Sequence, residues 1–214
     1  MMKDNLIDFW NQRHEKLGLY SGGDKGISDY ENFEFYIHRL SMILKLISKY
    51  YIGKKLLEVL DAGCGKGFFS NGIFSSGYIV NGIDSSASAI SFCKENYPEI
   101  FFKQDNLDKF ILDKAFDVII CIDVMFHIVE DSLWENSVKN LAYHAKNNSI
   151  IIISDYIDAT DSEKAIGEKI KYIKYRNKKK YSEILEPFGF FLKNTVPYDI
   201  LSNKNSFMVF QRKG

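Results

Sequence analysis

Residues 56–70 read LLEVLDAGCGKGFFS, and this stretch decides the fold. It opens with an apolar run, Leu56–Leu60, that is typical of a buried β-strand. Three glycines follow at alternate positions, Gly63, Gly65 and Gly67, before the chain resumes a helical pattern. Glycines between a strand and a helix allow a sharp turn and let a ligand come close to the backbone. The stretch therefore predicts a strand–turn–helix unit that binds a nucleotide-like ligand.

Strand-like and helix-like segments alternate from this unit onward. Alternation of this kind predicts a parallel sheet covered by helices on both faces, in an α/β fold. We expect further strands at residues 78–83, 100–103, 116–122 and 149–154, and helices at residues 67–75, 86–96 (capped by Ser85 or Ser86) and 131–145.

The pattern changes toward the C-terminus. The pattern predicts one long helical stretch over residues 160–187, with a break near Asn177, and then strands at 190–196 and 206–212. The linker between these strands, PYDILSNKN, is too short for a crossover helix, so we expect an antiparallel pair. The result is a Rossmann-like, seven-stranded, mostly parallel sheet with an antiparallel last strand.

Length and composition favour one domain over residues 1–214, with an N-terminal helical lid (1–52) and a core (53–214). Lys plus Arg equal Asp plus Glu at 28 each, which argues against a nucleic-acid partner. The three cysteines are scattered and the chain starts without a signal-peptide pattern, so we expect a cytoplasmic protein with reduced thiols. The apolar runs are too short for membrane insertion.

The residue before the glycine turn helps to choose its ligand. Dinucleotide-binding turns use G-x-G-x-x-G, whereas this turn reads G-x-G-x-G and is preceded by Asp61. A carboxylate there would repel a pyrophosphate but suits a ligand with an ammonium group, which favours S-adenosylmethionine over NAD. The alternative without any ligand is a tight structural turn.

Two more acids follow the next two strands. Asp84, in GIDSS, can accept hydrogen bonds from a ribose diol, or it can serve only as an acid at a helix N-terminus. Asp105, in KQDNLD, can accept a bond from an adenine amine while the backbone N–H groups of Asn106 and Leu107 face the ring. Its alternative is an ordinary loop aspartate.

The motifs from Leu56 to Ser154 together resemble the class I (Rossmann-like) S-adenosylmethionine-dependent methyltransferases, of the bacterial small-molecule type. LLEVLDAGCGKG looks like their first motif, GIDSSASAI their second-strand motif, FFKQDNLD their adenine motif and FDVIICIDVMFHIVED their fourth-strand motif. The resemblance implies a role for each cofactor-binding residue. Asp61 and Gly63, with Cys64 and Gly65, would hold the methionine end, Asp84 with Ser85 the ribose, Asp105 with Asn106 the adenine, and the carbonyl near Cys121 the amino group.

The N-terminal segment DFWNQRHEKLGLYSGGDKG resembles the lead segment of some bacterial small-molecule methyltransferases, which folds over the cofactor. The matching positions are Trp10, Arg13, His14, Tyr20 and Ser21, and the match ends at GGDKG. The resemblance predicts that Tyr20 covers the cofactor and that Arg13 and His14 bind the acceptor. The alternative is a core-packing helix with a loop.

Methyl transfer to a hydroxyl needs a general base. His127 follows the fourth strand, where ligands bind in open α/β sheets, and its ordinary pKa suits proton transfer at neutral pH. Asp123 is the second catalytic candidate, and Asp155 and Tyr156, after the fifth strand, are candidate acceptor contacts. Each has an alternative role in packing, capping or turn formation. Asp123 and His127 are too few ligands for a metal site.

The segment 169–180, KIKYIKYRNKKK, holds seven basic residues and no acid. Ile166, Ile170 and Ile173 repeat at helical spacing, so we expect outward charges that are either solvated or face a phosphorylated acceptor. The favoured function is O-methylation of a sugar or a nucleotide-linked glycan precursor. Alternatives are N-methylation of an amine, protein or RNA, a non-catalytic scaffold that binds S-adenosylmethionine, and an NAD-dependent reductase.

Overall fold

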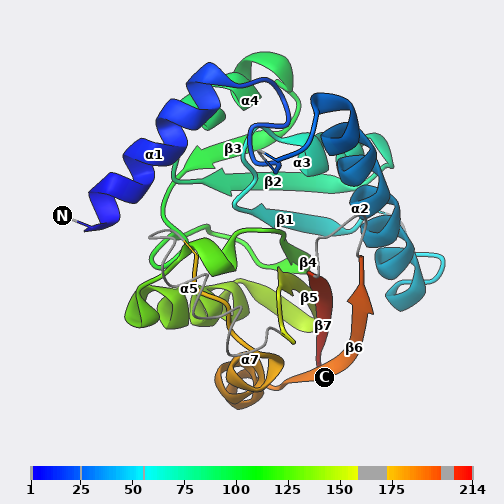
Figure 1. Cartoon of the computed structure of the whole chain (residues 1–214). Coiled ribbons are helices and arrows are strands. Elements are labelled where there is room, and N and C mark those ends of the chain that lie inside the picture. The colour runs from blue at the N-terminus through cyan, green and yellow to red at the C-terminus, as the bar shows by residue number, and fades with distance from the viewer. Residues whose placement is uncertain (1, 25, 55, 159–172, 199–204, 214) are drawn as a thin grey trace. The chain divides into compact units, whose positions relative to one another are not determined.

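The computed structural model describes residues 2–24, 26–54, 56–158, 173–198 and 205–213 (Figure 1). The chain divides into two compact units, Met1–Asn106 and Leu107–Gly214, which are described one at a time.

The first unit is built on three parallel strands in the order β3-β2-β1. Asp61 of β1 pairs with Gly82 of β2, and Asp84 of β2 pairs with Gln104 of β3. Because the strands are parallel, their carboxyl ends share one edge. The elements are β1 (Glu58–Ala62), α3 (Phe68–Ser75), β2 (Ile79–Asp84), α4 (Ala87–Asn96) and β3 (Phe101–Gln104).

Two N-terminal helices precede these strands, α1 (Met2–Lys16) and α2 (Asp29–Tyr50). Helix α2 begins with a capping box, in which Ser28 and Glu31 satisfy each other's backbone N–H groups. Helix α1 packs on α4, and α2 packs on α3.

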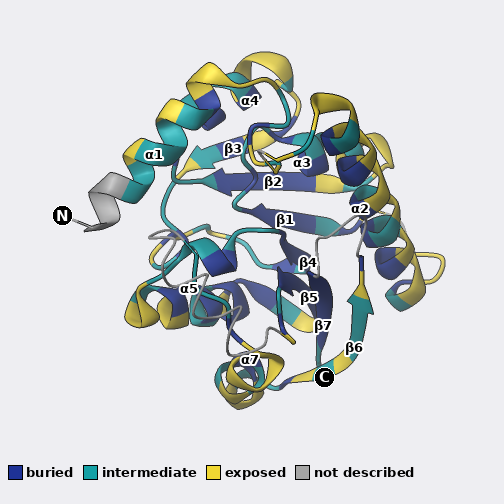
Figure 2. Cartoon of the chain, viewed as in Figure 1, coloured by how far each residue is buried: buried dark blue, intermediate teal, exposed yellow. Residues whose placement is uncertain are grey.

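The second unit carries four strands in the order β4-β5-β7-β6. Strands β4 and β5 are parallel, and β7 lies between β5 and β6, antiparallel to both. Figure 2 shows β4, β5 and β7 largely buried. The elements are β4 (Phe116–Cys121), η1 (Met125–His127), α5 (Asp131–Tyr143), β5 (Ala145–Asp155), α7 (Lys178–Leu185), η2 (Glu186–Phe188), β6 (Phe190–Pro197) and β7 (Ser206–Arg212).

The predicted fold class is confirmed. The two units supply seven strands that are parallel except for the pairs that β7 makes, and helices pack around them. The expected long helix over 160–187 is wrong at residues 173–177, which are not helical. A helix begins only after Asn177, which is the N-cap of α7 and whose side chain accepts from the Lys180 N–H group. Among the described residues, no helix combines the length and the apolar character needed to cross a bilayer.

The expectation for the basic segment is wrong in two respects among the described residues. Residues 169–172, Ile166 and Ile170 lie outside the described residues, and residues 173–177 are not helical. Arg176 is 2% exposed rather than turned outward, because its guanidinium finds a carboxylate and two carbonyl groups inside the second unit.

Candidate functional site

The glycine turn of the first unit lies between β1 and α3 in a left-handed backbone conformation. The φ angles of Gly63, Gly65 and Gly67 are 83°, 51° and 76°, values that favour glycine. The N–H groups of Gly63 and Cys64 both donate to the carbonyl of Ile83, at 2.7 and 2.9 Å. These bonds fasten the turn to the end of β2.

Asp61 lies in β1, just ahead of the turn, and is 1% exposed. The hydroxyl of Ser70 in α3 donates to its carboxylate at 2.6 Å. Burial raises the pKa of Asp61 to about 7, against the opposing effect of the Ser70 bond. A cation bound beside this carboxyl would favour its ionised form.

Asp84 ends β2 and connects two backbone segments. One carboxylate oxygen accepts from the Gly65 N–H group at 2.9 Å, and the other accepts from the Ser86 N–H group at 2.8 Å. The second bond is the helix-terminal role that the sequence left open. Each carboxylate oxygen can accept a further bond, and the residue is only half-buried, so a diol can still bind. Ser85, next to it, is also half-buried.

Asp105 follows β3 and is held by its neighbours. Its N–H group donates to the carbonyl of Asp84 at 3.0 Å, and its carboxylate accepts from the Asn106 N–H group at 2.9 Å. The ammonium of Lys103 lies 3.0 Å from the other carboxylate oxygen. Asp61, Asp84 and Asp105 thus follow one another along the carboxyl edge of β1, β2 and β3.

Arg13 and His14 hold the loop that follows α1. The Arg13 guanidinium donates to the carbonyls of Ser21 and Gly23, and His14 Nδ1 lies 2.7 Å from Ser21 Oγ. A Cβ at Gly65 would lie 3.5 Å from His14 Cε1, so the imidazole lies against the glycine turn. Burial lowers the pKa of His14, despite the opposing charge of Asp84. The expected acceptor contacts of Arg13 and His14 stay predictions.

Tyr20 joins an aromatic cluster beside the same turn. Its ring lies 5.3 Å from the ring of Tyr36 and 5.8 Å from that of Phe68, the first residue of α3. Lys66, within the turn, donates to the carbonyl of Leu17 at 2.7 Å. The N-terminal segment therefore packs on the glycine turn, as a lid over that turn requires.

Further bonds that the sequence did not reveal hold α1 on α4. The hydroxyl of Ser86 donates to the Asn11 side chain at 2.8 Å, and the hydroxyl of Ser88 donates to the Asn11 carbonyl at 3.0 Å. No periodic pattern marks Asn11, because a single polar contact between two helices leaves no repeat in the sequence.

In the second unit, Asp123 follows β4 with a left-handed φ of 57°. Its N–H group donates to Ser154 Oγ at 2.6 Å, and its Oδ1 accepts from Ser154 at 3.0 Å, Tyr198 at 2.5 Å and Asn205 at 3.3 Å. This carboxylate ties the loop after β4 to β5 and to the ends of the β6–β7 connection. Its expected catalytic role stays a prediction.

His127 ends η1 and is half-exposed, with its ring 4.5 Å from that of Phe126. The backbone N–H group of Lys174 donates to the carbonyl of Phe126 at 2.7 Å, so a segment distant in the sequence holds η1 in place. Two expected cofactor contacts also lie in this unit. Cys121 is buried at the end of β4, and the carbonyl of Leu107 accepts from the Asn140 side chain at 3.1 Å.

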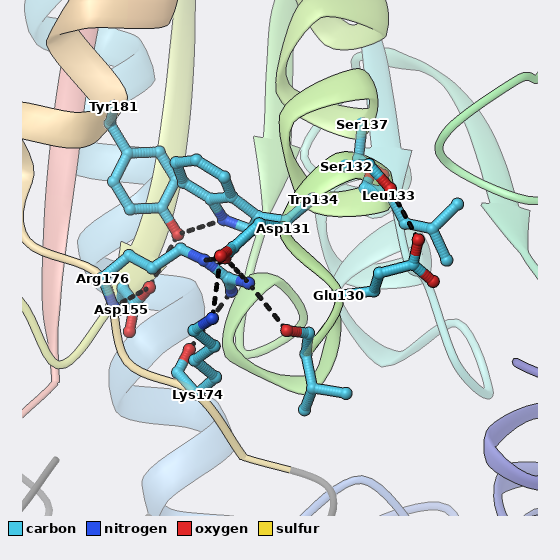
Figure 3. Close-up of polar contacts among 11 residues, drawn as sticks. Glu130, Asp131, Ser132, Leu133, Trp134, Ser137, Asp155, Lys174, Arg176 and Tyr181 are labelled. Atoms are coloured by element: carbon cyan, nitrogen blue, oxygen red, sulfur yellow. Dashed lines mark hydrogen bonds and ion pairs between the residues drawn. The ribbon is translucent and has the colours of Figure 1, made fainter. Parts of the chain in front are cut away.

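Asp155 and Tyr156, the two candidate acceptor contacts after β5, differ in their exposure to solvent. Asp155 is buried, and it accepts from the Tyr156 N–H group at 2.7 Å. It also accepts from the Tyr181 hydroxyl at 2.6 Å and from the Arg176 N–H group at 3.4 Å (Figure 3). Burial raises the pKa of Asp155 to about 7. Tyr156 is half-exposed, with its ring 5.2 Å from that of Tyr175. Of the two, Tyr156 keeps an exposed surface for an acceptor.

Arg176 was not singled out from the sequence. It is the one arginine among the seven basic residues of segment 169–180. Arginine is favoured over lysine in buried ion pairs because its planar guanidinium satisfies several acceptors at once. An arginine among lysines was therefore the sequence signal that could have marked Arg176 as buried. The sequence could not identify its partner, Asp131, which is distant along the chain.

Comparison with known proteins gives a family for the chain. A family model described as "Methyltransferase domain" matches residues 53–196. The ubiquinone biosynthesis O-methyltransferase of Rickettsia felis is 31% identical over 157 residues, which is 70% of this chain and 63% of that protein. The chain thus matches less than two thirds of that relative's length.

Two solved structures are similar in fold. The magnesium protoporphyrin IX methyltransferase of Synechocystis, solved with bound S-adenosylmethionine, has a TM-score of 0.73 at 18% identity and covers 100% of this chain and 98% of its own. The N-methyltransferase NodS of Bradyrhizobium japonicum, in complex with S-adenosylhomocysteine, has a TM-score of 0.68 at 14% identity, over 84% of this chain and 88% of its own.

Proposed function

The chain belongs to the methyltransferase domain family, and from this membership we propose that it transfers the methyl group of S-adenosylmethionine to a hydroxyl of a small molecule. The observation that carries the proposal is the glycine turn of the first unit, where the buried Asp61 precedes the turn and Asp84 accepts from its Gly65 N–H group. The Rickettsia felis relative, which is named an O-methyltransferase, favours oxygen as the methylated atom.

The first unit offers groups for each part of the cofactor. Asp61 and the turn residues Gly63, Cys64 and Gly65 would receive the methionine end, because a buried carboxyl suits an ammonium. Asp84 with Ser85 would bind the ribose hydroxyls through its unused acceptor positions. Asp105 and Asn106 would face the adenine, and Tyr20 with His14 would close the site from the lid.

In the second unit, His127 is the proposed general base. The cofactor supplies an activated methyl group, so the remaining requirement for a hydroxyl acceptor is removal of its proton. The half-exposed imidazole of His127 can take that proton as the oxygen–carbon bond forms. Asp123 would orient the loop that carries His127, and Tyr156 would contact the acceptor. The carbonyl near Cys121 and the backbone of Leu107 stay proposed cofactor contacts.

The acceptor is proposed only as a small molecule with a hydroxyl, and not as the sugar or nucleotide-linked precursor that the sequence favoured. The relative acts in ubiquinone biosynthesis by its name, which gives no support to a sugar or nucleotide-linked acceptor. The buried position of Arg176 also removes one cation from the expected phosphate surface. N-methylation is the second candidate, because NodS shares the fold, although at 14% identity.

Titration with S-adenosylhomocysteine, followed by methylation assays, tests the proposal. We expect binding in the micromolar range, and we expect Asp84→Ala to weaken it at least about tenfold through the lost ribose bonds. Asp158→Ala, an exposed acid on the loop after β5, is the control. Methyl transfer to catechol but not to a primary amine supports O-methylation. The absence of binding below millimolar concentration would reject an enzyme that uses this cofactor.

A further inference from the structure

One short segment contacts both the loop that carries His127 and the loop that carries Tyr156. It consists of three consecutive residues, Lys174, Tyr175 and Arg176. We name them the Lys174–Arg176 bridge. All three lie in the second unit, between the fifth strand and α7, and none is in a helix or strand. The sequence pattern placed them on a basic surface, whereas Arg176 is buried and Lys174 and Tyr175 are half-buried.

The first residue of the bridge holds η1. The backbone N–H group of Lys174 donates to the carbonyl of Phe126 at 2.7 Å, one residue before His127. Its ammonium lies 2.9 Å from the carboxylate of Asp131, at the start of α5. Lys174 therefore holds the loop after β4 at two points.

The second residue of the bridge touches both loops with one ring. The ring of Tyr175 lies 6.0 Å from that of Phe126 and 5.2 Å from that of Tyr156. The loop after β4 and the loop after β5 are thus connected through a single aromatic side chain.

The third residue closes the arrangement with a buried cation. The guanidinium of Arg176 donates to Asp131 Oδ1 at 3.0 and 3.3 Å and to the carbonyls of Val129 and Lys174, each at 3.2 Å. It lies 4.6 Å from the Trp134 ring, and its backbone N–H group donates to Asp155 at 3.4 Å. Figure 3 shows these contacts converging on Arg176.

A buried cation with this many acceptors has one geometry that satisfies it. Each acceptor satisfies an N–H group that is costly to leave unpaired in the interior, so the groups around the guanidinium are held in place. A planar guanidinium fixes directions as well as distances, which an ammonium cannot do.

We propose that Arg176 is a positioning residue for methyl transfer, and that through the Lys174–Arg176 bridge it sets the places of His127 and Tyr156. The inference rests on the proposed function of these two residues. Arg176 touches neither the acceptor nor the cofactor in this role. Proton transfer and acceptor alignment tolerate little displacement, so a loosened bridge lowers the rate.

Kinetics of Arg176→Gln, Arg176→Lys and Lys179→Gln, with catechol as the acceptor, test the inference. Lys179 is an exposed cation of α7 and serves as the control. We expect Arg176→Gln to lower kcat about ten- to a hundredfold while the dissociation constant of S-adenosylhomocysteine changes less than about twofold. Arg176→Lys should recover part of kcat, and Lys179→Gln should match the wild type. A folded Arg176→Gln with wild-type kcat and KM would overturn the inference.

Nuclear magnetic resonance of the imidazole groups gives a second measurement that needs no turnover. The signals of His127, assigned with His127→Ala, should shift in Arg176→Gln and in Asp131→Asn but not in Lys179→Gln. Asp131 is largely exposed, so its variant keeps the fold if Arg176→Gln does not. Unchanged His127 signals overturn the inference. If the His127 signals shift in these variants but the wild-type protein transfers no methyl group, the proposed function is rejected and the structural link between Arg176 and His127 is not.

Discussion

Asp61 combines deep burial with a pKa raised to about 7 by that burial. The hydroxyl of Ser70 donates to its carboxylate. A carboxyl in this state takes up or releases a proton near neutral pH, according to the charge that is placed beside it. That property makes cofactor binding through Asp61 testable by pH.

We predict that S-adenosylhomocysteine binds about tenfold more tightly at pH 8 than at pH 6. The ammonium group requires the ionised form of Asp61, whose population rises about tenfold between these values when the pKa is near 7. Asp61→Asn should bind more weakly at pH 8 and should show a flatter dependence on pH. Isothermal titration at both values measures this, and equal slopes for the two proteins would contradict the prediction.

His127→Ala should lower kcat for a hydroxyl acceptor by about a hundredfold or more, because general-base catalysis contributes factors of this size. Binding of S-adenosylhomocysteine should stay within about twofold. The control is His38→Ala, which removes an exposed imidazole from α2. Steady-state kinetics with catechol decide the matter, and nearly full activity of His127→Ala would exclude the base.

Each secondary-structure element is accounted for by local sequence to a different degree. The segment β1–turn–α3 follows its sequence closely, because an apolar run, three glycines and a helical pattern all agree. Strand β5 begins at Ala145 and not at Ser149, because Ala145 pairs with Phe116 of β4, and a register irregularity separates this pair from the pairing that resumes at Ile150. No local pattern reveals this early pair. Segment 173–177 takes its shape from Asp131 and Asp155, which are distant in the sequence.

Gly67 of the turn and Gly53, which follows α2, allow a matched pair of substitutions. A Cβ at Gly67 would lie 3.0 Å from both Cys93 Sγ and the Tyr97 ring, whereas a Cβ at Gly53 would meet nothing within 4 Å. Both residues have positive φ angles, so each alanine variant pays about 1–2 kcal/mol for the left-handed conformation. We predict that Gly67→Ala costs at least about 1 kcal/mol more because of crowding. Urea unfolding measures both, and equal losses would contradict the prediction.

Buried carboxyl groups affect the stability of the whole chain. Asp155 has a pKa of about 7 in the folded protein because it is buried, well above its ordinary value of 3.8. Between pH 4 and pH 7 the folded state therefore keeps a proton that the unfolded state has lost. Stability from this group consequently falls as pH rises through that range and changes little above it.

We predict that wild-type protein loses up to about 4 kcal/mol more than Asp155→Asn between pH 4 and pH 7. The asparagine variant is less stable at low pH, because its amide has one acceptor oxygen for the donors of Tyr156, Tyr181 and Arg176. Its slope against pH is therefore the diagnostic quantity. Asp158→Asn, with an exposed side chain, is the control. Urea unfolding at several pH values measures the slopes, and parallel curves for wild type and Asp155→Asn would contradict the prediction.

The sequence by itself determined the α/β fold, the glycine turn and the acids after three successive strands, because these depend on local patterns and on the strand order that such patterns impose. Only the tertiary structure decided which polar side chains have partners within the protein. It assigned Arg13 to the Ser21 and Gly23 carbonyls, Asp155 to a buried network, and Arg176 to the interior of its unit. These roles depend on partners distant in the sequence, and charge composition cannot distinguish a solvated cation from one that is paired and buried.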